Sequence, residues 1–318
     1  MSSPDEQLQA LGRDLTELAK KGCLDPVVGR DREIEQALRV LCRRSKSNPL
    51  LLGEPGVGKT ALAEGLAMAL AAEDSPPSLA GRRIFELQLG SLLAGTQFRG
   101  DLEQRLKSLL EVVKKNRTIL FIDEIHLLVQ AGRGGGMDAG NLLKPVLSRG
   151  DVSCIGATTA CEAKEMFKLD PAMERRFQPV LVEEPSPELV KLMLMAMRHK
   201  LEAHHRLRIT DEAVAAAVDQ SLQNASLGRS NPDRALDILE NACAAEQIRL
   251  SRARKAEASE RINPELQKWK DKLATATRDF DLERHAAAEA MLLKITSDSA
   301  TNVPEEISVL SADHILGV

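Results

Sequence analysis

Eight residues near position 55 have the types and the spacing of a loop that binds phosphate. Residues 53–60 read Gly-Glu-Pro-Gly-Val-Gly-Lys-Thr, which is a G-x-x-x-x-G-K-T pattern. Glycines let the backbone curl so that successive N–H groups face one anion, and a helix beginning near Lys59 adds its dipole. In such a loop Lys59 reaches the β- and γ-phosphates and Thr60 holds Mg²⁺. The pattern therefore predicts a site for ATP and Mg²⁺, with the nucleotide on Gly53, Glu54, Pro55, Gly56, Val57, Gly58, Lys59, Thr60 and Ala61.

The residues around this loop predict a strand before it and a helix after it. Residues 49–52 are an apolar run, and residues 61–70 are rich in good helix formers. A glycine turn in some other α/β crossover is the alternative interpretation. The order strand, loop and helix favours the phosphate-binding loop.

A second strand pattern ends in two carboxylates. Residues 118–122 are apolar and rich in β-formers, and Asp123 and Glu124 follow directly. Ligand sites in open α/β sheets lie at the carboxyl edge of the parallel strands. This Walker B pattern predicts that Asp123 binds Mg²⁺ and that Glu124 orients and deprotonates the attacking water. A solvated Asp-Glu pair at a strand end is the alternative.

Two further polar signals follow along the chain. The strand pattern at 152–157 ends in a Thr158-Thr159 pair, whose hydroxyls could sense the γ-phosphate or could simply reflect β-propensity. Residues 170–177 predict a short capped helix that ends in Arg175 and Arg176. On composition alone, these arginines are a solvated helix end.

Periodicity predicts an α/β fold with a parallel five-stranded sheet, followed by helical regions. We expect four parts: a large α/β nucleotide-binding subdomain at 1–185 with a lead-in helix at 1–24, a small all-α lid at 186–258, a short helical hairpin at 259–300, and a linker at 301–318. Within them, residues 7–21 predict an amphipathic helix, and separate helices are predicted from 232 to about 256, over 264–277 and over 281–295.

Composition excludes several classes of protein. The net charge of the 318 residues is −4, so no global basic field recruits nucleic acid or an anionic membrane. No apolar run approaches the length of a membrane span, and the N-terminus lacks the features of a signal peptide. The five cysteines form no C-x-x-C pair, which favours free thiols over zinc or disulfides. We therefore expect a cytoplasmic protein, or one in an organelle lumen.

Taken in order, these signals resemble a AAA+ ATPase module. Four segments are similar to the first nucleotide-binding module of the ClpB/ClpC class of ring-shaped unfoldases: residues 25–30, 53–60, 137–145 and 174–178. The resemblance covers roughly residues 12–250. It implies that Val27 and Val28 line an adenine pocket and that Thr159 is sensor 1. Arg234 occupies the place of a sensor-2 residue, where this class more often has lysine.

The resemblance also implies a ring. Arg175 and Arg176 would be arginine fingers that act on the nucleotide of the neighbouring subunit, because a cation supplied across the interface stabilises charge on the transferring phosphoryl group. Gln97, Phe98 and Arg99 match a substrate-gripping pore loop that usually carries lysine and tyrosine in place of the first two. Phe98 keeps the aromatic group, while Gln97 loses a positive charge.

The implied function is that of an ATP-hydrolysing motor module of a hexameric Clp-type chaperone. Its partners would be unfolded or aggregated polypeptides threaded through a pore, together with an adaptor or co-chaperone. The alternative is a single-ring or regulatory module that binds ATP and assembles with partners without translocating a substrate. A nucleic-acid AAA+ protein is disfavoured by the acidic balance. Since we recognise no amino-terminal substrate domain and no second ATPase module, we expect a fragment or a natural single-ring protein.

Overall fold

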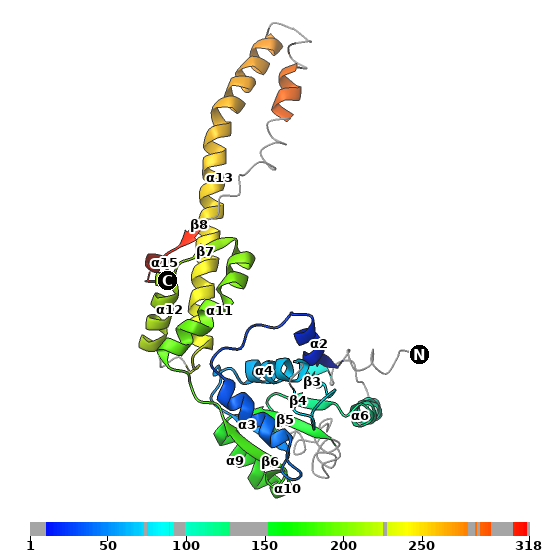
Figure 1. Cartoon of the computed structure of the whole chain (residues 1–318). Coiled ribbons are helices and arrows are strands. Elements are labelled where there is room, and N and C mark those ends of the chain that lie inside the picture. Colours follow the sequence, from blue (N-terminus) through cyan, green and yellow to red (C-terminus); the bar gives the residue numbers. More distant parts are fainter. Residues whose placement is uncertain are drawn as a thin grey trace. The chain divides into compact units, whose positions relative to one another are not determined.

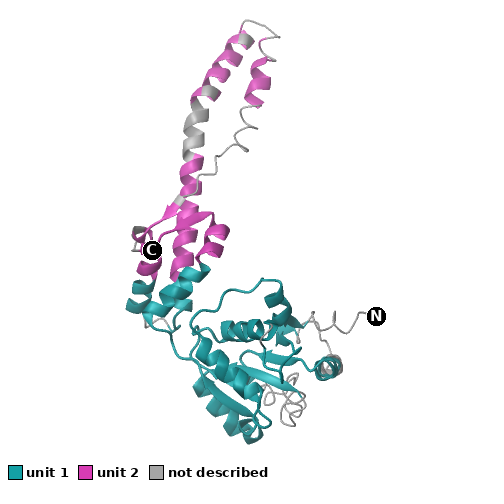
Figure 2. Ribbon diagram, viewed as in Figure 1, with its two compact units in different colours: residues 1–197, 218–237 teal, residues 198–217, 238–318 magenta. Residues whose placement is uncertain are grey.

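The computed structural model describes residues 11–72, 75–88, 90–91, 99–127, 152–224, 228–278, 284, 287–293 and 308–316. The predicted pore-loop residues Gln97 and Phe98, and the segment 137–145, lie outside the described residues. The chain divides into two compact units (Figure 2). The first comprises residues 1–197 and 218–237, and the second comprises residues 198–217 and 238–318.

The first unit is built on a six-stranded sheet with the order β1-β3-β4-β5-β2-β6 (Figure 1). The strands are β1 (Gly12–Asp14), β2 (Asn48–Leu52), β3 (Ile84–Leu87), β4 (Ile119–Ile122), β5 (Ser153–Thr158) and β6 (Phe177–Leu181). The strands from β3 to β6 in this order pair in parallel. This confirms the predicted five-stranded parallel sheet.

Strand β1 corrects the prediction of a lead-in helix. It pairs antiparallel with β3 at the edge of the sheet, and among the described residues 11–24 only α2 (Leu15–Lys20) is helical. A side chain on Gly12 would place its Cβ 1.8 Å from the carbonyl oxygen of Glu86, so glycine permits the close pairing. The Arg13 guanidinium also donates to Glu86 at 2.6 Å. These contacts between distant residues outweigh the local helical periodicity.

Helices cover both faces of the sheet, because parallel strands are buried on two sides. They are α2, α3 (Asp31–Leu41), α4 (Lys59–Ala71), α6 (Arg99–Lys115), α9 (Ala160–Leu169) and α10 (Pro171–Glu174). Successive residues of β4 alternate between two apolar clusters: Ile119 and Phe121 pack with α2, α3 and α4, whereas Leu120 and Ile122 pack with α6, α9 and α10. All four side chains are fully buried.

The second unit contains a pairing that the sequence did not predict. Strand β7 (Leu207–Ile209) pairs in parallel with β8 (Ser308–Leu310), and α15 (Ala312–Leu316) follows. Residues 308–316 were predicted to be part of a linker, but Leu310 and Ile315 are fully buried. The Nε2 atom of His314 also lies 3.5 Å from a carboxylate oxygen of buried Glu246. The C-terminal segment therefore contributes to the core of this unit.

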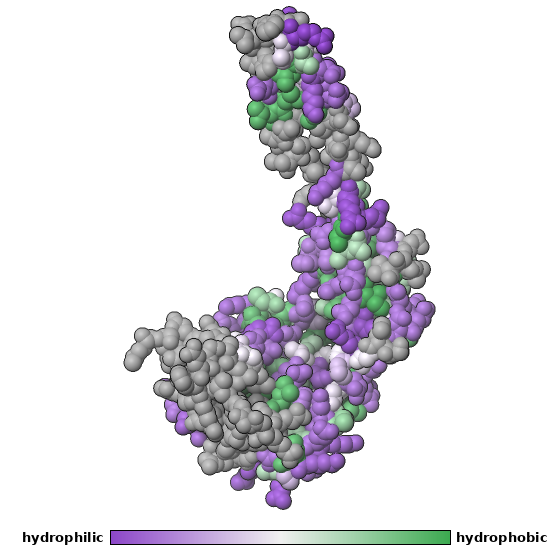
Figure 3. All heavy atoms as spheres, turned by 180° about the vertical axis from the view of Figure 1, so that it is seen from behind, coloured by the Kyte–Doolittle hydropathy of each residue, from purple (hydrophilic) through white to green (hydrophobic). Residues whose placement is uncertain are grey.

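Three long helices extend through both units. They are α11 (Pro187–His205), α12 (Asp211–Gln223) and α13 (Asp233–Arg278). Helix α13 is continuous through Pro264, so the prediction of separate helices ending near 256 and starting at 264 is wrong. The intervening residues are mostly good helix formers, which carry the helix through despite the missing N–H of proline. Within the described residues, no helix combines the length and apolar character that crossing a bilayer requires. On one side, Figure 3 shows hydrophilic residues over much of the described surface.

The β7–β8 pairing predicts opposite effects for two adjacent residues of β8. Leu310 is fully buried, whereas Val309 is 51% exposed. We expect Leu310→Ala to lower the free energy of unfolding by about 2–4 kcal/mol, because it leaves a cavity. Val309→Ala is the matched control and is expected to cost under about 1 kcal/mol. Urea denaturation measures both, and equal effects would contradict the described packing of β8.

Candidate nucleotide-binding site

The loop between β2 and α4 has a backbone that requires glycine. Gly56 and Gly58 have φ values of +86° and +93°, and Gly58 is the N-cap of α4. A side chain on Gly53 would place its Cβ 2.4 Å from the carbonyl oxygen of Val182. These are backbone conditions that side chains rarely tolerate. Glycine at these positions lets the backbone adopt the tight curve that a phosphate-binding loop needs.

The Lys59 ammonium is held at this loop by weak acceptors. Its Nζ donates to the carbonyl oxygens of Gly53 at 2.9 Å and Glu54 at 3.0 Å. Desolvation lowers the pKa of Lys59, while the negative charges of Asp123 and Glu162 act to raise it. A half-buried ammonium that is paired only with carbonyls has much to gain from an anion. The loop therefore fits a phosphate group.

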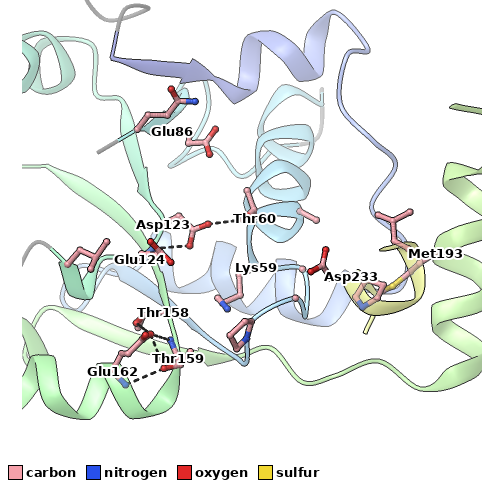
Figure 4. A pocket seen from close by; sticks show the side chains of 18 of the residues that line it. Lys59, Thr60, Glu86, Asp123, Glu124, Thr158, Thr159, Glu162, Met193 and Asp233 are labelled. Atoms are coloured by element: carbon pink, nitrogen blue, oxygen red, sulfur yellow. Dashed lines mark hydrogen bonds between the residues drawn. The ribbon is translucent and has the colours of Figure 1, made fainter. Parts of the chain in front are cut away.

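Thr60 and Asp123 come from distant parts of the chain and meet in this site. The Thr60 hydroxyl donates to Asp123 Oδ2 at 2.9 Å, and the backbone N–H of Glu124 donates to Asp123 Oδ1 at 2.9 Å (Figure 4). Glu124 has a φ of +49°, an uncommon value for a residue other than glycine. A hydroxyl and a carboxylate are the oxygen donors that Mg²⁺ prefers, and protein Mg²⁺ sites use few side chains. The donor set fits the ion.

A hydrogen-bonded cluster lies at the end of β5. Thr159 is the N-cap of α9, and its backbone N–H and its hydroxyl donate to Glu162 Oε2 at 3.0 and 2.8 Å. Thr158 also donates to this oxygen at 2.9 Å, and buried His126 contacts the Thr158 hydroxyl. Although desolvation acts to raise it, the hydrogen bonds from Thr159 and Thr158 lower the pKa of Glu162. The structure thus gives Thr159 a capping role, and its role as sensor 1 stays a prediction.

One cavity of about 790 Å³ in the first unit is lined by Lys59, Thr60, Asp123, Glu124, Thr158, Thr159 and Glu162. The sequence predicted every loop residue of the lining, together with Asp123, Glu124 and Thr159. Three predicted loop residues, Gly53, Glu54 and Val57, do not line it. The Thr158-Thr159 pair was recognised as well. The sequence did not predict the residues that complete the wall: Glu86, Leu87, Gln88, Gly90, Leu127, Glu162, Met193, Leu194, Met197, Pro232, Asp233 and Leu236. Glu86 could have been found, since it lies near the carboxyl end of a parallel strand. The apolar residues of α11 had no signal that separates them from core residues.

Other predicted site residues lie away from the lining. Val27 is close to Gly65 of α4, where an added Cβ would lie 3.3 Å from its side chain. Arg175 and Arg176 are exposed just after α10. Arg234 is only 7% exposed, and its guanidinium donates to Glu184. The roles of these residues toward a nucleotide stay predictions.

The fold and this site define a module of the AAA ATPases. Residues 49–184 match the family described as "ATPase family associated with various cellular activities", and residues 186–292 match the AAA lid domain. The chain belongs to this family and therefore to a class of nucleotide-binding proteins. Within it, the chain is a first AAA+ module of the ClpB/ClpC class of chaperones, as its relatives show.

Two relatives are Clp proteins. The chain is 42% identical to the chloroplastic chaperone protein ClpC2 of Arabidopsis thaliana, over 96% of this chain and 32% of that protein. It is 46% identical to ClpC, an ATP-binding subunit of the Clp protease in Staphylococcus aureus, over 88% of this chain and 34% of that protein. The chain spans about a third of the length of these relatives.

Solved structures of Saccharomyces cerevisiae Hsp104 have a similar fold. The Hsp104–ADP complex matches with a TM-score of 0.75 and 38% identity, over 92% of this chain and 41% of that chain. The extended Hsp104–casein complex matches with a TM-score of 0.69 and 36% identity, over 94% of this chain and 54% of that chain.

The loop geometry predicts different effects for two Gly→Ala substitutions. Gly81 has a φ of +71° and open space where a Cβ would lie, whereas a Cβ on Gly56 would lie 2.8 Å from the carbonyl oxygen of Ser230. Both substitutions strain the backbone, by about 1–2 kcal/mol. Only Gly56→Ala also displaces the loop, so we expect it alone to weaken nucleotide binding. Unfolding curves and titration with a fluorescent ADP analogue measure both effects. Equal nucleotide affinity in the two variants would contradict this geometry.

Proposed function

We propose that this chain binds ATP with Mg²⁺ and hydrolyses ATP as the motor module of a ring-forming Clp-type chaperone. The observation that carries the proposal is that one cavity brings together Lys59, the Thr60–Asp123 pair and Glu124. Side chains suited to phosphate binding, metal binding and water activation thus lie together, which supports the proposal.

The position of each of these residues suits one role in ATP binding or hydrolysis. Bound ATP with Mg²⁺ supplies a phosphoryl group whose charge is partly neutralised. Thr60 and Asp123 would hold the ion, and Lys59 would exchange its carbonyl contacts for the phosphate oxygens. Glu124 is exposed to the cavity and would orient a water molecule and accept its proton. Its backbone, which is fixed beside Asp123, keeps the carboxylate near the metal site.

The proposed ring rests on the two arginines after α10. Arg175 and Arg176 are exposed and do not line the cavity of their own chain. They suit a role as arginine fingers for a neighbouring subunit in a hexamer, where they stabilise transition-state charge. Arg234 and the segment with Val27 and Val28 would support the nucleotide from within the same chain.

We further propose that the assembled ring threads unfolded or aggregated polypeptides through a pore lined by Gln97, Phe98 and Arg99. The similarity to Hsp104, one of whose structures is a complex with casein, supports this proposal. An adaptor or co-chaperone would be a further partner. One relative is chloroplastic, and we place this chain in the cytoplasm or an organelle lumen.

Removing the proposed base tests the hydrolytic step. Glu124→Gln keeps the shape and the binding groups but cannot accept a proton, so we expect ATP hydrolysis to fall by about 10²-fold or more. ATP affinity is expected to persist, which traps the nucleotide-bound state. Steady-state hydrolysis and filter binding of ATP measure the two quantities. The control is Glu165→Gln, an exposed position on α9. Undiminished turnover in Glu124→Gln would remove Glu124 from this role.

Removing the pore-loop aromatic separates hydrolysis from substrate handling. We expect Phe98→Ala to retain ATP hydrolysis and to lose binding of fluorescein-labelled casein, because an aromatic ring supplies most of the contact area of such a loop. Phe98→Tyr is the matched control and should retain both properties. Fluorescence anisotropy in ATP measures casein binding. If Phe98→Ala binds casein normally, the threading proposal is wrong and the regulatory alternative gains support.

A further inference from the structure

A turn late in the first unit rests directly on the phosphate loop. The backbone N–H of Ser230 donates to the carbonyl oxygen of Pro55 at 2.9 Å, and that of Asp233 donates to the carbonyl oxygen of Gly56 at 3.3 Å. The approach is so close that a Cβ on Gly56 would lie 2.9 Å from the Cβ of Asp233. Because the turn takes up carbonyl oxygens of the loop, it helps to fix the direction of the intervening peptide planes. The carbonyl groups of Pro55 and Gly56 are thus directed at the turn.

One carboxylate contacts this turn at two points. Glu184 Oε1 accepts from the backbone N–H of Asn231 at 2.7 Å and from the Arg234 guanidinium at 3.3 Å. A second nitrogen of that guanidinium donates to the carbonyl oxygen of Arg229. Arg234 therefore ties the two ends of the turn together and anchors them to Glu184. A planar guanidinium can serve both acceptors at once, which a lysine ammonium on its flexible stem does less well.

Glu184 lies just after β6, close to the strand that leads into the phosphate loop. The backbone N–H of Val182 donates to the carbonyl oxygen of Leu52 at 2.7 Å. The contacts thus connect the phosphate loop to the turn, and the turn to Glu184 through Arg234. Glu184 follows β6, whose end is bonded to the end of β2 just before the loop.

The position of Arg234 does not suit direct contact with a nucleotide. Pro232, Asp233 and Leu236 line the cavity, but Arg234 does not. Its side chain is nine-tenths buried and its charge is directed at Glu184. A group that reads the γ-phosphate needs an accessible charge at the cavity wall.

We propose that Arg234 is a positioning residue: through Glu184 and the turn at 229–233, it sets the geometry of the phosphate loop and does not contact the γ-phosphate. The proposal rests on the proposed function in one respect, namely that the cavity binds nucleotide. It follows that Arg234 and Glu184 act as one unit. The unit supports ADP and ATP equally, because both place phosphates on the same loop.

Hydrogen exchange of the full chain without nucleotide tests the positioning directly. We expect Arg234→Ala and Glu184→Ala each to speed exchange of the Ser230 amide by roughly tenfold or more, since its bond to Pro55 loses its support. Arg39→Ala is the matched control, because Arg39 also pairs with a carboxylate but is an exposed residue on α3. Unchanged exchange at Ser230 in both variants would overturn the proposal, whether or not the chain binds nucleotide.

Affinities for ADP and ATP separate positioning from phosphate sensing. We expect each of the two variants to weaken both nucleotides by a similar factor, roughly tenfold, and the double variant to be no worse than either single one. Isothermal titration with ADP and a non-hydrolysable ATP analogue measures these affinities. A different result would overturn the proposal and assign Arg234 to the γ-phosphate: Arg234→Ala lowers the affinity for the ATP analogue alone, and Glu184→Ala has near-normal affinity for both nucleotides. If the unaltered chain binds neither nucleotide, the proposed function fails, and the exchange experiment still decides the positioning.

Discussion

The site depends on the register of the parallel strands, because strands β2 and β4 must end at the same level at one edge of the sheet. In the register of the sheet, Leu50 of β2 lies opposite Gly156 of β5, and Gly156 lies opposite Ile122 of β4. These three residues therefore form one row across the sheet. The phosphate loop begins three residues after Leu50, and Asp123 follows Ile122 directly, so the Thr60 hydroxyl and the Asp123 carboxylate meet above the same edge. Gly156 permits this packing, because a Cβ there would lie 2.9 Å from Leu50.

The residues that meet at this edge could be predicted from the sequence, because each motif is local. The loop at 53–60 and the pair Asp123-Glu124 carry their signal in adjacent residues, and the carboxyl-edge rule predicts that they meet. The parallel sheet could also be predicted from local patterns, because apolar strand segments alternate with loops and helices along the sequence. Thr159 was also located, although its hydroxyl is committed to capping α9, which its position before Glu162 could have indicated.

What the sequence did not indicate depends on contacts between distant residues. Strand β1 is set by its pairing with β3, and β8 by its pairing with β7, about a hundred residues earlier. Three-residue strands have too little periodicity to be recognised alone. Proline favours the first position of a helix, so Pro264 predicts a helix start, yet it lies within α13. The apolar residues of α11 that line the cavity could not be recognised either, because a helix face at a cavity wall has the same apolar periodicity as a face in the core.

The charges of the cavity favour the proposed binding of nucleotide together with a divalent cation. Among the described residues that line it, Lys59 is opposed by the carboxylates of Glu86, Asp123, Glu124, Glu162 and Asp233. Arg13 pairs with Glu86 and Arg229 pairs with Asp233 from outside the lining, but the remaining carboxylates still outnumber Lys59. A free triphosphate would be repelled by such a surface, because like charges in a partly desolvated site interact strongly. In the proposed complex, a divalent cation held by Thr60 and Asp123 would offset this repulsion. The excess of carboxylates, which would weaken binding of the bare anion, thus supports the proposal that the nucleotide binds together with Mg²⁺.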